Sequence, residues 1–460
     1  MLQTLKNAWK IPELKSKLLF TLMIIVLYRL GSNLPMPWVD PSILETYFNA
    51  TGGGLSWLNM LSGGALAQAT LFALSVSPYI TASIVMQLLT IAIPKLEAWA
   101  KEGEAGKKKI SAITRILTVG LALVTAIGYT MFMNAQGMLT FTSNKDWTTF
   151  DKWFAYVVLV LAYCAGASVI MWLAEKINEH GIGNGISIIL FANIIARLPS
   201  MLGSVWNRCF TRWHILVENE VENWRLVQWP IGALLLALFA AILIAAVVAV
   251  VWFSNSERRI PVQYAKRVVG RKMYGGQSTT LPIKLDMAGV MPVIFASSIV
   301  SILPTIAGFI PASKTGFWGG FRDVVNNYLG HNSFPYIAMQ LILIIAFAYF
   351  YIMISFNPVE VANNLRSNGG AVPGIRPGKP TVDYIKKILN RITLLGAIFL
   401  CGLSGIPMIV NAVWFAIDGV GIADLAFSGT SLLIVVGVAL ETFRELEAQM
   451  TLRNYKGFLD

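Results

Sequence analysis

One stretch of the chain, from Thr46 to Pro94, runs for 49 residues without an Asp, Glu, Lys or Arg. A single helical crossing of a bilayer needs only about 20 apolar residues, so this stretch is more than twice that length. Pro78 removes a backbone donor and disfavours helix at Ser77, which predicts a break there. We therefore expect a short half-helix of small residues from Ala65 to Leu74, then a hinge, then a spanning helix.

A break inside a spanning segment leaves polar backbone groups open at membrane depth. Such groups are tolerated only where they are buried in protein or line a wet cavity. The break near Pro78 therefore indicates a pore or a binding site.

Composition supports a polytopic membrane protein. The chain is 56% hydrophobic and 13% charged, with a mean hydropathy of +0.63, whereas soluble proteins carry roughly 25% charged residues. A basic N-terminus precedes Leu18 to Leu27 as in a signal peptide, but no A-x-A cleavage site follows, so we expect the first spanning helix there. The spacing of Cys164, Cys209 and Cys401 fits neither a metal nor a redox motif.

The apolar segments predict an all-α protein with ten transmembrane helices. Their expected ranges are 18–36, 76–93, 113–134, 154–173, 184–198, 230–253, 288–310, 335–356, 391–411 and 427–441. An even number of crossings places both termini on one side. Of the 36 lysines and arginines, 27 lie in the two tails and the four connections on that side, against seven in the opposite loops. The positive-inside rule then predicts that both termini are cytoplasmic.

Five spans precede the long outer loop 199–229 and five follow it, which predicts two five-helix halves in inverted orientation. Repeats of this kind place their working site at the interface near the bilayer midplane. The expected organisation is an N-terminal half at 1–198, an outer hinge loop at 199–229, a C-terminal half at 230–445 and a cytoplasmic tail at 446–460.

The distribution of charge separates the function classes. Ion-coupled transporters usually carry Asp, Glu or His inside their spans, and here the second, fourth and sixth to ninth spans carry none between their ends. An intramembrane enzyme needs an acid, base or nucleophile set that the spans do not offer. We therefore expect no catalytic residues, no metal and no cofactor, and a small-molecule secondary transporter with a discontinuous helix remains the alternative to a channel.

Two cytoplasmic loops, 254–287 and 357–390, are each longer than 30 residues and mix basic side chains with Gly and Pro turns. Loops of this length are usually functional. One interpretation is positive-inside charge with binding to anionic lipid. The other is docking of an anionic partner such as ribosomal RNA, whose phosphates attract Lys and Arg, and length and turn chemistry favour docking.

Long motifs across nearly the whole chain resemble the SecY family, the central subunit of the bacterial protein-translocation channel. The resemblance is carried by LYRLGSNLPMP at 27–37, SGGALAQATLFALSVSPYITASIVMQLL at 62–89, KEGEAGKKKIS at 101–111, EHGIGNGIS at 179–187, the run from AKRVVGRKMYGGQSTTLPIK onwards at 265–298, FNPVEVANNL at 356–365, GAVPGIRPGKPT at 370–381 and GTSLLIVV at 429–436. The outer loops 135–152, 199–229 and 311–333 carry little of it.

The resemblance implies an hourglass pore between the two halves, narrowed at mid-membrane by a ring of apolar side chains. It places this ring at Val76, Ile80, Ile186, Leu190, Ile294 and Ile434. Large aliphatic side chains exclude water and therefore ions, and their non-directional contacts can part for an extended chain. Val76 and Leu190 stand where the family often has isoleucine, and both changes conserve shape.

The resemblance also implies a plug at about 61–74 and a lateral gate between the second and seventh spans. The plug residues are Leu61, Ser62, Gly63, Gly64, Ala65, Leu66, Ala67, Gln68, Ala69, Thr70, Leu71 and Phe72. The gate residues are Thr81, Ser83, Gln87, Met291, Ser297 and Ser298. Hydrogen bonds between such polar groups are expected to hold the gate shut, each contributing about 0.6–2 kcal/mol in a membrane.

Docking of partners is expected at the basic loops. The residues implied are Arg258, Arg259, Lys266, Arg267, Arg271, Lys272, Arg376 and Lys379. Arg376 matches the loop arginine that the family needs for work with the motor ATPase, and Arg271 and Lys272 match a basic pair at the ribosome-contacting loop tip.

The function implied is a passive protein-conducting channel of the bacterial cytoplasmic membrane. It would pass unfolded, signal-bearing chains across the membrane and release membrane helices sideways into it. The partners implied are SecE and SecG small subunits, the SecA ATPase, the ribosome with its rRNA, signal peptides and nascent chains, and membrane lipids.

Overall fold

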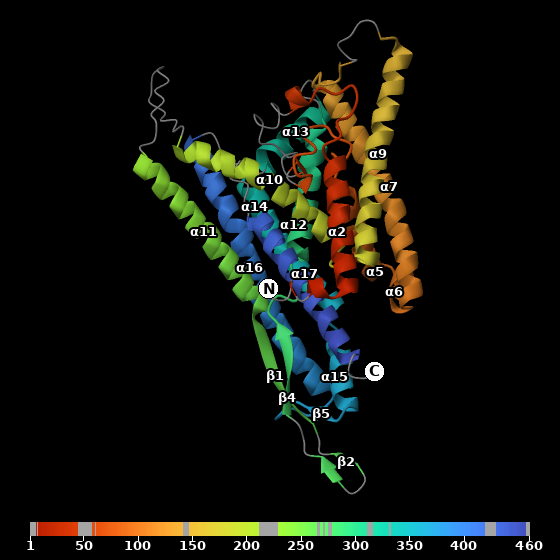
Figure 1. Ribbon diagram of the computed structural model, residues 1–460, viewed down its shortest axis with the longest axis vertical. Coiled ribbons are helices and arrows are strands. Elements are labelled where there is room, and N and C mark those ends of the chain that lie inside the picture. The colour runs from red at the N-terminus through yellow and green to blue at the C-terminus, as the bar shows by residue number, and fades with distance from the viewer. Residues whose placement is uncertain are drawn as a thin grey trace.

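The computed structural model is mostly helical and forms a bundle with a small sheet at one end (Figure 1). The structure describes residues 6, 8–44, 58–59, 61–140, 147–210, 229–264, 267–269, 272–274, 278–310, 316–330, 333–418 and 429–456. Of the residues expected at functional positions, Lys266 and Arg271 lie outside the described residues.

Each of the ten expected spans coincides with one helix. These helices are α2 (Pro12–Gly31), α5 (Ser77–Ala92), α7 (Glu104–Ala135), α9 (Thr149–His180), α10 (Gly185–Phe210), α11 (Trp229–Asn255), α12 (Met291–Gly308), α14 (Phe334–Ser355), α16 (Lys379–Asp418) and α17 (Gly429–Lys456). Within the described ranges, five helices are long and apolar enough to cross a membrane by themselves, or six if the bent pair α5 and α6 (Pro94–Lys101) is one span. The chain is therefore a multi-pass membrane protein, and ten crossings agree with its helices.

Several helices run past the expected span ends. α10 continues through Pro199 to Phe210, so the first part of the expected hinge loop 199–229 is helical, and residues 211–228 lie outside the described part of the chain. α17 extends to Lys456, so most of the expected tail is helical as well. Apolar runs predict the length that fits the bilayer, whereas a helix continues until a cap or a breaker stops it.

The helix α5 begins where the sequence predicted a break. Pro78 occupies the first turn, where its missing N–H costs nothing. The apolar run then continues to Ala92, and Pro94 starts α6 after a bend of 100°. Two prolines thus set both ends of this helix.

The expected half-helix from Ala65 to Leu74 is not present. Residues 62–76 form a series of tight turns, apart from an isolated bridge residue at Thr70. Ala69 and Ser75 have φ values of 47° and 51°, which a right-handed helix cannot contain. The physical reason is pairing with the preceding loop, because the Met36 N–H donates to the Ala69 carbonyl and the Leu71 N–H donates to the Leu34 carbonyl.

A small sheet joins the two long basic loops. β1 (Glu257–Tyr264) pairs antiparallel with β4 (Ser278–Lys284), and β5 (Gly370–Ala371) from the second loop adds to the free edge of β1. β2 (Arg267–Val269) and β3 (Lys272–Tyr274) form a separate hairpin that projects at the tip (Figure 1). The sequence predicted docking elements in both loops, but it did not reveal these strands.

The sheet rests on an apolar cluster at the ends of the helices. Ile260, Val262 and Ile283 alternate with exposed residues along the strands and pack with Leu365 of α15 (Pro358–Ser367) and Leu389 of α16. Alternation with period two is the pattern of a strand with one buried face. The described parts of the two loops therefore pack together, and we call them the sheet platform.

Candidate functional site

The six residues expected to form the apolar ring lie in one hydrophobic cluster. Five of them are at most 3% exposed, and Ile186 is half-buried and packs against the cluster. They belong to four helices and their caps: Val76 caps the start of α5 and Ile80 lies in its first turns, Ile186 and Leu190 lie at the start of α10, Ile294 at the start of α12 and Ile434 in α17. We call these six residues the apolar ring.

The spacing of the ring residues along the chain explains why their side chains point to one place. Val76 and Ile80, and likewise Ile186 and Leu190, are four residues apart, which places both members of each pair on one helix face. The faces meet because α5 contacts α12 and α10 contacts α17. Two of these helices come from the first five spans and two from the last five.

The plug segment, residues 61–74, lies between two cores. Leu61 and Phe72 belong to the cluster that contains the apolar ring, whereas Leu66 and Ala69 belong to the core formed with α7 and α9. All twelve expected plug residues are among those that the structure describes, and Gln68 is the one exposed residue of these twelve. The segment therefore lies directly against the ring.

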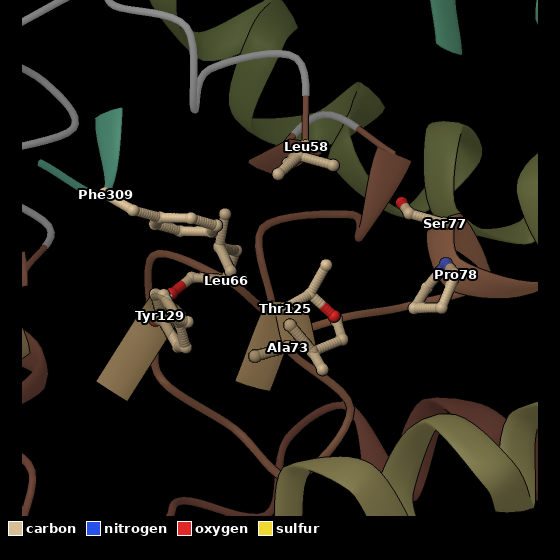
Figure 2. Close-up of a pocket in the computed structure, with 9 residues that line it drawn as sticks. Leu58, Leu66, Ala73, Ser77, Pro78, Thr125, Tyr129 and Phe309 are labelled. Atoms are coloured by element: carbon tan, nitrogen blue, oxygen red, sulfur yellow. The ribbon is translucent and has the colours of Figure 1, made fainter. Parts of the chain in front are cut away.

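Polar contacts hold the plug segment on several sides. The Tyr129 hydroxyl of α7 donates to the Leu66 carbonyl at 2.6 Å, and the Ala67 N–H donates to Asn59 Oδ1 at 3.0 Å. Phe72 stacks on Tyr28 of α2 with ring centroids 5.6 Å apart. A small apolar pocket opens between the segment and its neighbours, with Leu66 and Tyr129 on one side and Pro78 on the other (Figure 2).

Asn193 of α10 is a functional candidate that sequence reasoning missed. It is fully buried, and its Nδ2 donates to the Leu61 carbonyl at 2.7 Å and to Ser75 Oγ at 3.3 Å. It stands three residues after the ring residue Leu190. The sequence does contain an indication of this role, since Asn193 is a single amide within the apolar run of α10. Burying a polar side chain in a span costs free energy unless it has a hydrogen-bond partner.

The gate residues do not form the hydrogen bonds expected across the gate. Gln87 Nε2 donates to Ser83 Oγ within α5, at 3.4 Å, and the Thr81 hydroxyl bonds the carbonyl of Ser77. On α12, the Ser297 hydroxyl bonds the Val293 carbonyl of its own helix. A Ser or Thr hydroxyl within a helix can donate to the backbone carbonyl one turn earlier, and a hydroxyl that does so has no proton left for a partner on the other helix.

Apolar contacts join the two sides of the expected gate instead. Ile80 and Ile84 of α5 and Val293 and Ile294 of α12 share the buried cluster, and Met291 packs against it. Ser298 is buried on the same helix. α5 and α12, which carry the expected gate residues, therefore meet through hydrophobic side chains.

Beside the contact between α5 and α12, a second contact joins α7 to Phe309, the residue that follows α12. A Cβ added at Gly128 would come within 2.7 Å of the Phe309 ring, so the glycine permits close approach. Phe309 also lines the pocket beside the plug segment (Figure 2).

Six of the eight basic residues expected to dock partners are among the described residues, and they lie in the two basic loops. Arg258 and Arg259 are exposed on β1, and Arg259 pairs with Glu257 at 2.7 Å. Arg267 and Lys272 lie on the projecting hairpin β2–β3. Arg376 is exposed in the turn before α16, and Lys379 is the exposed first residue of that helix. Gly374 and Gly378 in the turn have positive φ values, and the Thr381 hydroxyl donates to the Arg376 carbonyl.

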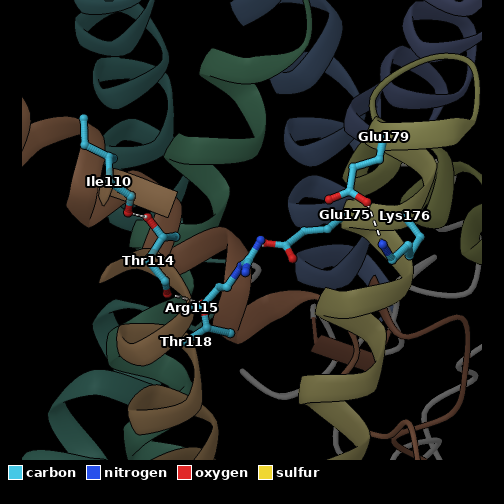
Figure 3. A network of polar contacts seen from close by, with 7 residues as sticks. All are labelled: Ile110, Thr114, Arg115, Thr118, Glu175, Lys176 and Glu179. Carbon is cyan, nitrogen blue, oxygen red and sulfur yellow. Dashed lines mark hydrogen bonds and ion pairs between the residues drawn. The ribbon is translucent and has the colours of Figure 1, made fainter. Parts of the chain in front are cut away.

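An ion-pair network links α7 and α9 near this end. Arg115 Nε contacts Glu175 at 2.8 Å and Lys176 contacts Glu179 at 2.6 Å (Figure 3). The Arg115–Glu175 pair joins the two helices, whereas the Lys176–Glu179 pair lies within α9. Solvent-accessible pairs of this kind contribute little stability. In the described part of the chain, no three His, Cys, Asp or Glu residues lie close enough to hold a metal.

Comparison with known proteins gives a consistent picture. The family model described as SecY matches residues 70–443. Relatives named protein translocase subunit SecY from Streptomyces coelicolor and Mycobacterium bovis are 42% and 41% identical, and each alignment covers all of both chains.

Solved structures share the fold. A structure described as "The structure of a protein conducting channel" has a TM-score of 0.57 at 17% identity, with 96% of both chains covered. Another, described as "Sec61 in the Canine ribosome-channel complex from the endoplasmic reticulum", has a TM-score of 0.54 at 16% identity and the same coverage. Full-length relatives above 40% identity, a family match over most of the sequence and a shared fold lead to one conclusion: the chain belongs to the SecY family.

Proposed function

We propose that this chain is the pore-forming subunit of a protein translocase. It is a passive channel through which unfolded, signal-bearing polypeptides cross a bacterial cytoplasmic membrane or leave sideways into the bilayer. The names of the relatives and the fold shared with a protein-conducting channel support this function. The observation that carries it is the apolar ring, with six side chains from four helices of both halves in one buried cluster.

The ring offers a physical basis for a channel that holds back ions. Its side chains have no polar atoms with which to replace the hydration shell of an ion, so a dry constriction blocks conduction. Contacts among aliphatic side chains have no preferred direction, so they part for an extended polypeptide of any sequence. The plug segment, seated against the ring, covers it in the resting state.

Sideways release is assigned to the seam between α5 and α12. Lipid tails are as apolar as the side chains in this seam, so parting the helices costs mainly their packing contacts. A signal helix that inserts there gains new packing contacts of the same kind. The expected gate residues Thr81, Ser83, Gln87, Met291, Ser297 and Ser298 line or flank this seam.

The charge pattern supports a membrane orientation and docking sites for cytoplasmic partners. The excess of Lys and Arg at the platform end assigns that end and both termini to the cytoplasm. The exposed Arg376 turn is assigned to the SecA ATPase and the β2–β3 hairpin to the ribosome, and the Sec61 ribosome-channel complex supports ribosome docking through a protein of the same fold. SecE and SecG subunits are the proposed membrane partners.

The alternative, a small-molecule secondary transporter, needs a polar or charged substrate site where the two halves meet. The six side chains of the apolar ring, where α5, α10, α12 and α17 meet, are all aliphatic, which disfavours such a site. Reconstitution with SecE and SecG subunits separates the two functions. SecA-dependent uptake of an unfolded preprotein is expected, and uptake of small solutes without preprotein transport would refute the channel.

Crosslinking tests the ring directly. In a chain without its natural cysteines, Val76→Cys and Ile186→Cys are expected to crosslink to a stalled translocating polypeptide that carries a single cysteine. Val124→Cys on α7 is the control, because that side chain is 64% exposed on the outer surface of the bundle. Crosslinks at residue 124 but not at residues 76 and 186 would show that the translocating polypeptide does not pass through the apolar ring.

Deletion tests the plug. Removing residues 65–74 is expected to raise the ion conductance of the reconstituted channel, because the ring then lacks its cover. Unchanged conductance of a correctly assembled channel would show that the segment has no sealing role.

A further inference from the structure

α13 (Phe317–Tyr328) is a helix that the spans and their connections do not explain. It lies between α12 and α14, at the end of the bundle opposite the sheet platform (Figure 1). It packs on both of these helices. Its carboxyl end is closed by the Leu329 N–H, which donates to the Val325 carbonyl at 2.7 Å.

The sequence of α13 is amphipathic. Phe317, Phe321, Val324 and Tyr328 recur at steps of three and four, which places them on one stripe. Trp318 flanks the stripe, and its ring meets those of Phe317 and Phe321 edge-on at 5.8 and 6.4 Å. The other side of the helix carries polar residues, among them Arg322, Asp323 and Asn326.

Only one flank of this stripe is buried against the described part of the protein. Val325 is 4% exposed and provides the packing contact. Phe321 is half-buried. Four other large side chains are open: Phe317 is 81% exposed, Tyr328 63%, Val324 57% and Trp318 55%. A short helix thus presents four large hydrophobic side chains to its surroundings, and such a surface indicates a binding face.

The position of α13 identifies what covers this face. α12 and α14 are both long and apolar enough to cross a membrane, so a helix packed across their ends lies at the bilayer surface. The same end of α12 exposes Ile302, Leu303 and Ile306, and α14 begins with Phe334, which is 80% exposed. The open stripe therefore continues an apolar surface that already faces lipid.

Composition favours lipid over a charged partner. Trp and Tyr collect at membrane interfaces, because each combines an apolar ring with a polar group that suits the headgroup layer, and Phe adds apolar surface to the same face. Helices of this pattern lie in the interface plane with the apolar face in the boundary between headgroups and acyl chains. Arg322 and Asp323, the charged residues of α13, pair with each other at 2.6 Å, so the helix carries no net charge to attract an anionic surface.

We propose that α13 is an interfacial anchor, with Phe317, Trp318, Val324 and Tyr328 inserted into the headgroup and acyl boundary of the leaflet opposite the sheet platform. The anchor fixes one end of α12 to the bilayer. This inference depends on the membrane location of the chain and is independent of the proposed transport function.

Fluorescence quenching tests the anchor. A chain without its natural cysteines carries either Val324→Cys, on the open stripe, or Asn326→Cys, on the polar side of the same helix. Each is labelled with an environment-sensitive dye and reconstituted, with its small subunits, in phosphatidylcholine vesicles. Lipid spin-labelled near the headgroup is expected to quench the dye at 324 at least twofold more than at 326, and aqueous iodide is expected to show the opposite order.

The outcomes separate the possible occupants. Equal quenching of both dyes by iodide would mean that the stripe faces water, and protection of the dye at 324 from both quenchers would mean that protein covers it; either result overturns the anchor. Addition of anionic lipid is expected to leave the quenching unchanged. Quenching that appears only with anionic lipid would overturn insertion by apolar contact.

Discussion

Asn193 and Leu61 are 132 residues apart in sequence, yet the side-chain amide of Asn193 donates to the Leu61 carbonyl across 2.7 Å. The same amide reaches Ser75 Oγ, and the Ser75 hydroxyl donates to the same carbonyl at 3.2 Å. Three polar groups thus connect Leu61, the first residue of the plug segment, and Ser75, which follows its last residue, to α10. Their site is next to the apolar ring, between Leu190 on one element and Val76 on the other.

Replacing Asn193 with leucine is expected to loosen the plug. The Ser75 hydroxyl still reaches the Leu61 carbonyl in the variant, so the net loss is about 1 kcal/mol, as for one hydrogen bond. That free energy raises the population of displaced plug about fivefold, which is measured as ion conductance of the reconstituted channel. Ser168→Ala, which removes a hydroxyl bonded to the Cys164 carbonyl of its own helix α9, is the control, and equal conductance of the two variants would contradict the role of Asn193.

Gly166 of α9 is expected to be required for seating the plug. A Cβ added there would lie 2.2 Å from the Leu71 carbonyl oxygen, so the backbone of the plug segment must move. Gly166→Ala is expected to lower stability by about 1–3 kcal/mol, as overpacking does, and to raise ion conductance.

The matched control for this variant is Gly120→Ala on α7, where a Cβ meets no atom of the described residues within 4 Å. Because alanine favours helix over glycine, this variant is expected to be as stable as wild type or up to about 1 kcal/mol more stable. Thermal unfolding in detergent compares the two. Similar midpoints for both variants would show that α9 tolerates the extra methyl group and that the plug does not depend on the close approach.

The sequence was sufficient to locate the ten long helices, because each contains an apolar run of about the length that a bilayer requires. It did not predict where several of these helices end, nor the shorter helices α6, α13 and α15. The start of α5 was predicted from Pro78 alone. The ring positions were transferred by resemblance, and the structure brings their side chains together. An apolar run and a proline are local features, so they predict a helix or its end without knowledge of the residues that pack against it.

What the sequence could not provide depends on distant pairing. Residues 65–74 are small and apolar, which suits a half-helix, but hydrogen bonds from Leu71 to Leu34 and from Met36 to Ala69 select tight turns instead. The strand β5 is two residues long and exists because β1 is beside it. The gate side chains likewise bond within their own helices, a choice that composition does not reveal.

Arg376→Glu is expected to abolish SecA-driven export by the reconstituted translocase. The side chain is exposed, and the turn is held by the Thr381 hydroxyl on the backbone carbonyl of Arg376 and by the positive φ values of Gly374 and Gly378. The charge reversal therefore leaves the turn intact while replacing attraction with repulsion toward an acidic partner surface. In vitro preprotein uptake measures the loss.

Arg366→Glu provides the control for charge alone. Arg366 is exposed in the last turn of α15, in the same loop. Uptake by this variant is expected to stay near that of wild type. If both reversals reduce uptake equally, the effect belongs to the charge of the platform and not to the Arg376 turn.

A buried carboxyl stands where the sheet platform joins the bundle. Asp286 accepts a hydrogen bond from the Ser254 hydroxyl at 3.1 Å, and Arg444 of α17 donates to the Ser254 carbonyl and to Asn255 Oδ1. Burial raises the pKa of Asp286, although the bonds from Ser254 and the Gly289 N–H and the charge of Arg444 oppose the shift. The protonated carboxyl is therefore the form that folding favours.

Stability should consequently fall as this carboxyl ionises in the folded protein. A pKa raised above the unfolded value of about 4 contributes stability that is fully present below that value and is lost as pH rises through the folded-state pKa. Asp286→Asn removes this dependence. The thermal midpoint of the variant minus that of wild type is therefore expected to increase as the pH rises from about 4. Asp383→Asn, at an exposed position on α16, is the control and should follow the wild-type curve. Parallel curves for Asp286→Asn and wild type would show that the Asp286 carboxyl ionises equally in the folded and unfolded chains, and the burial at this joint would then have no electrostatic cost.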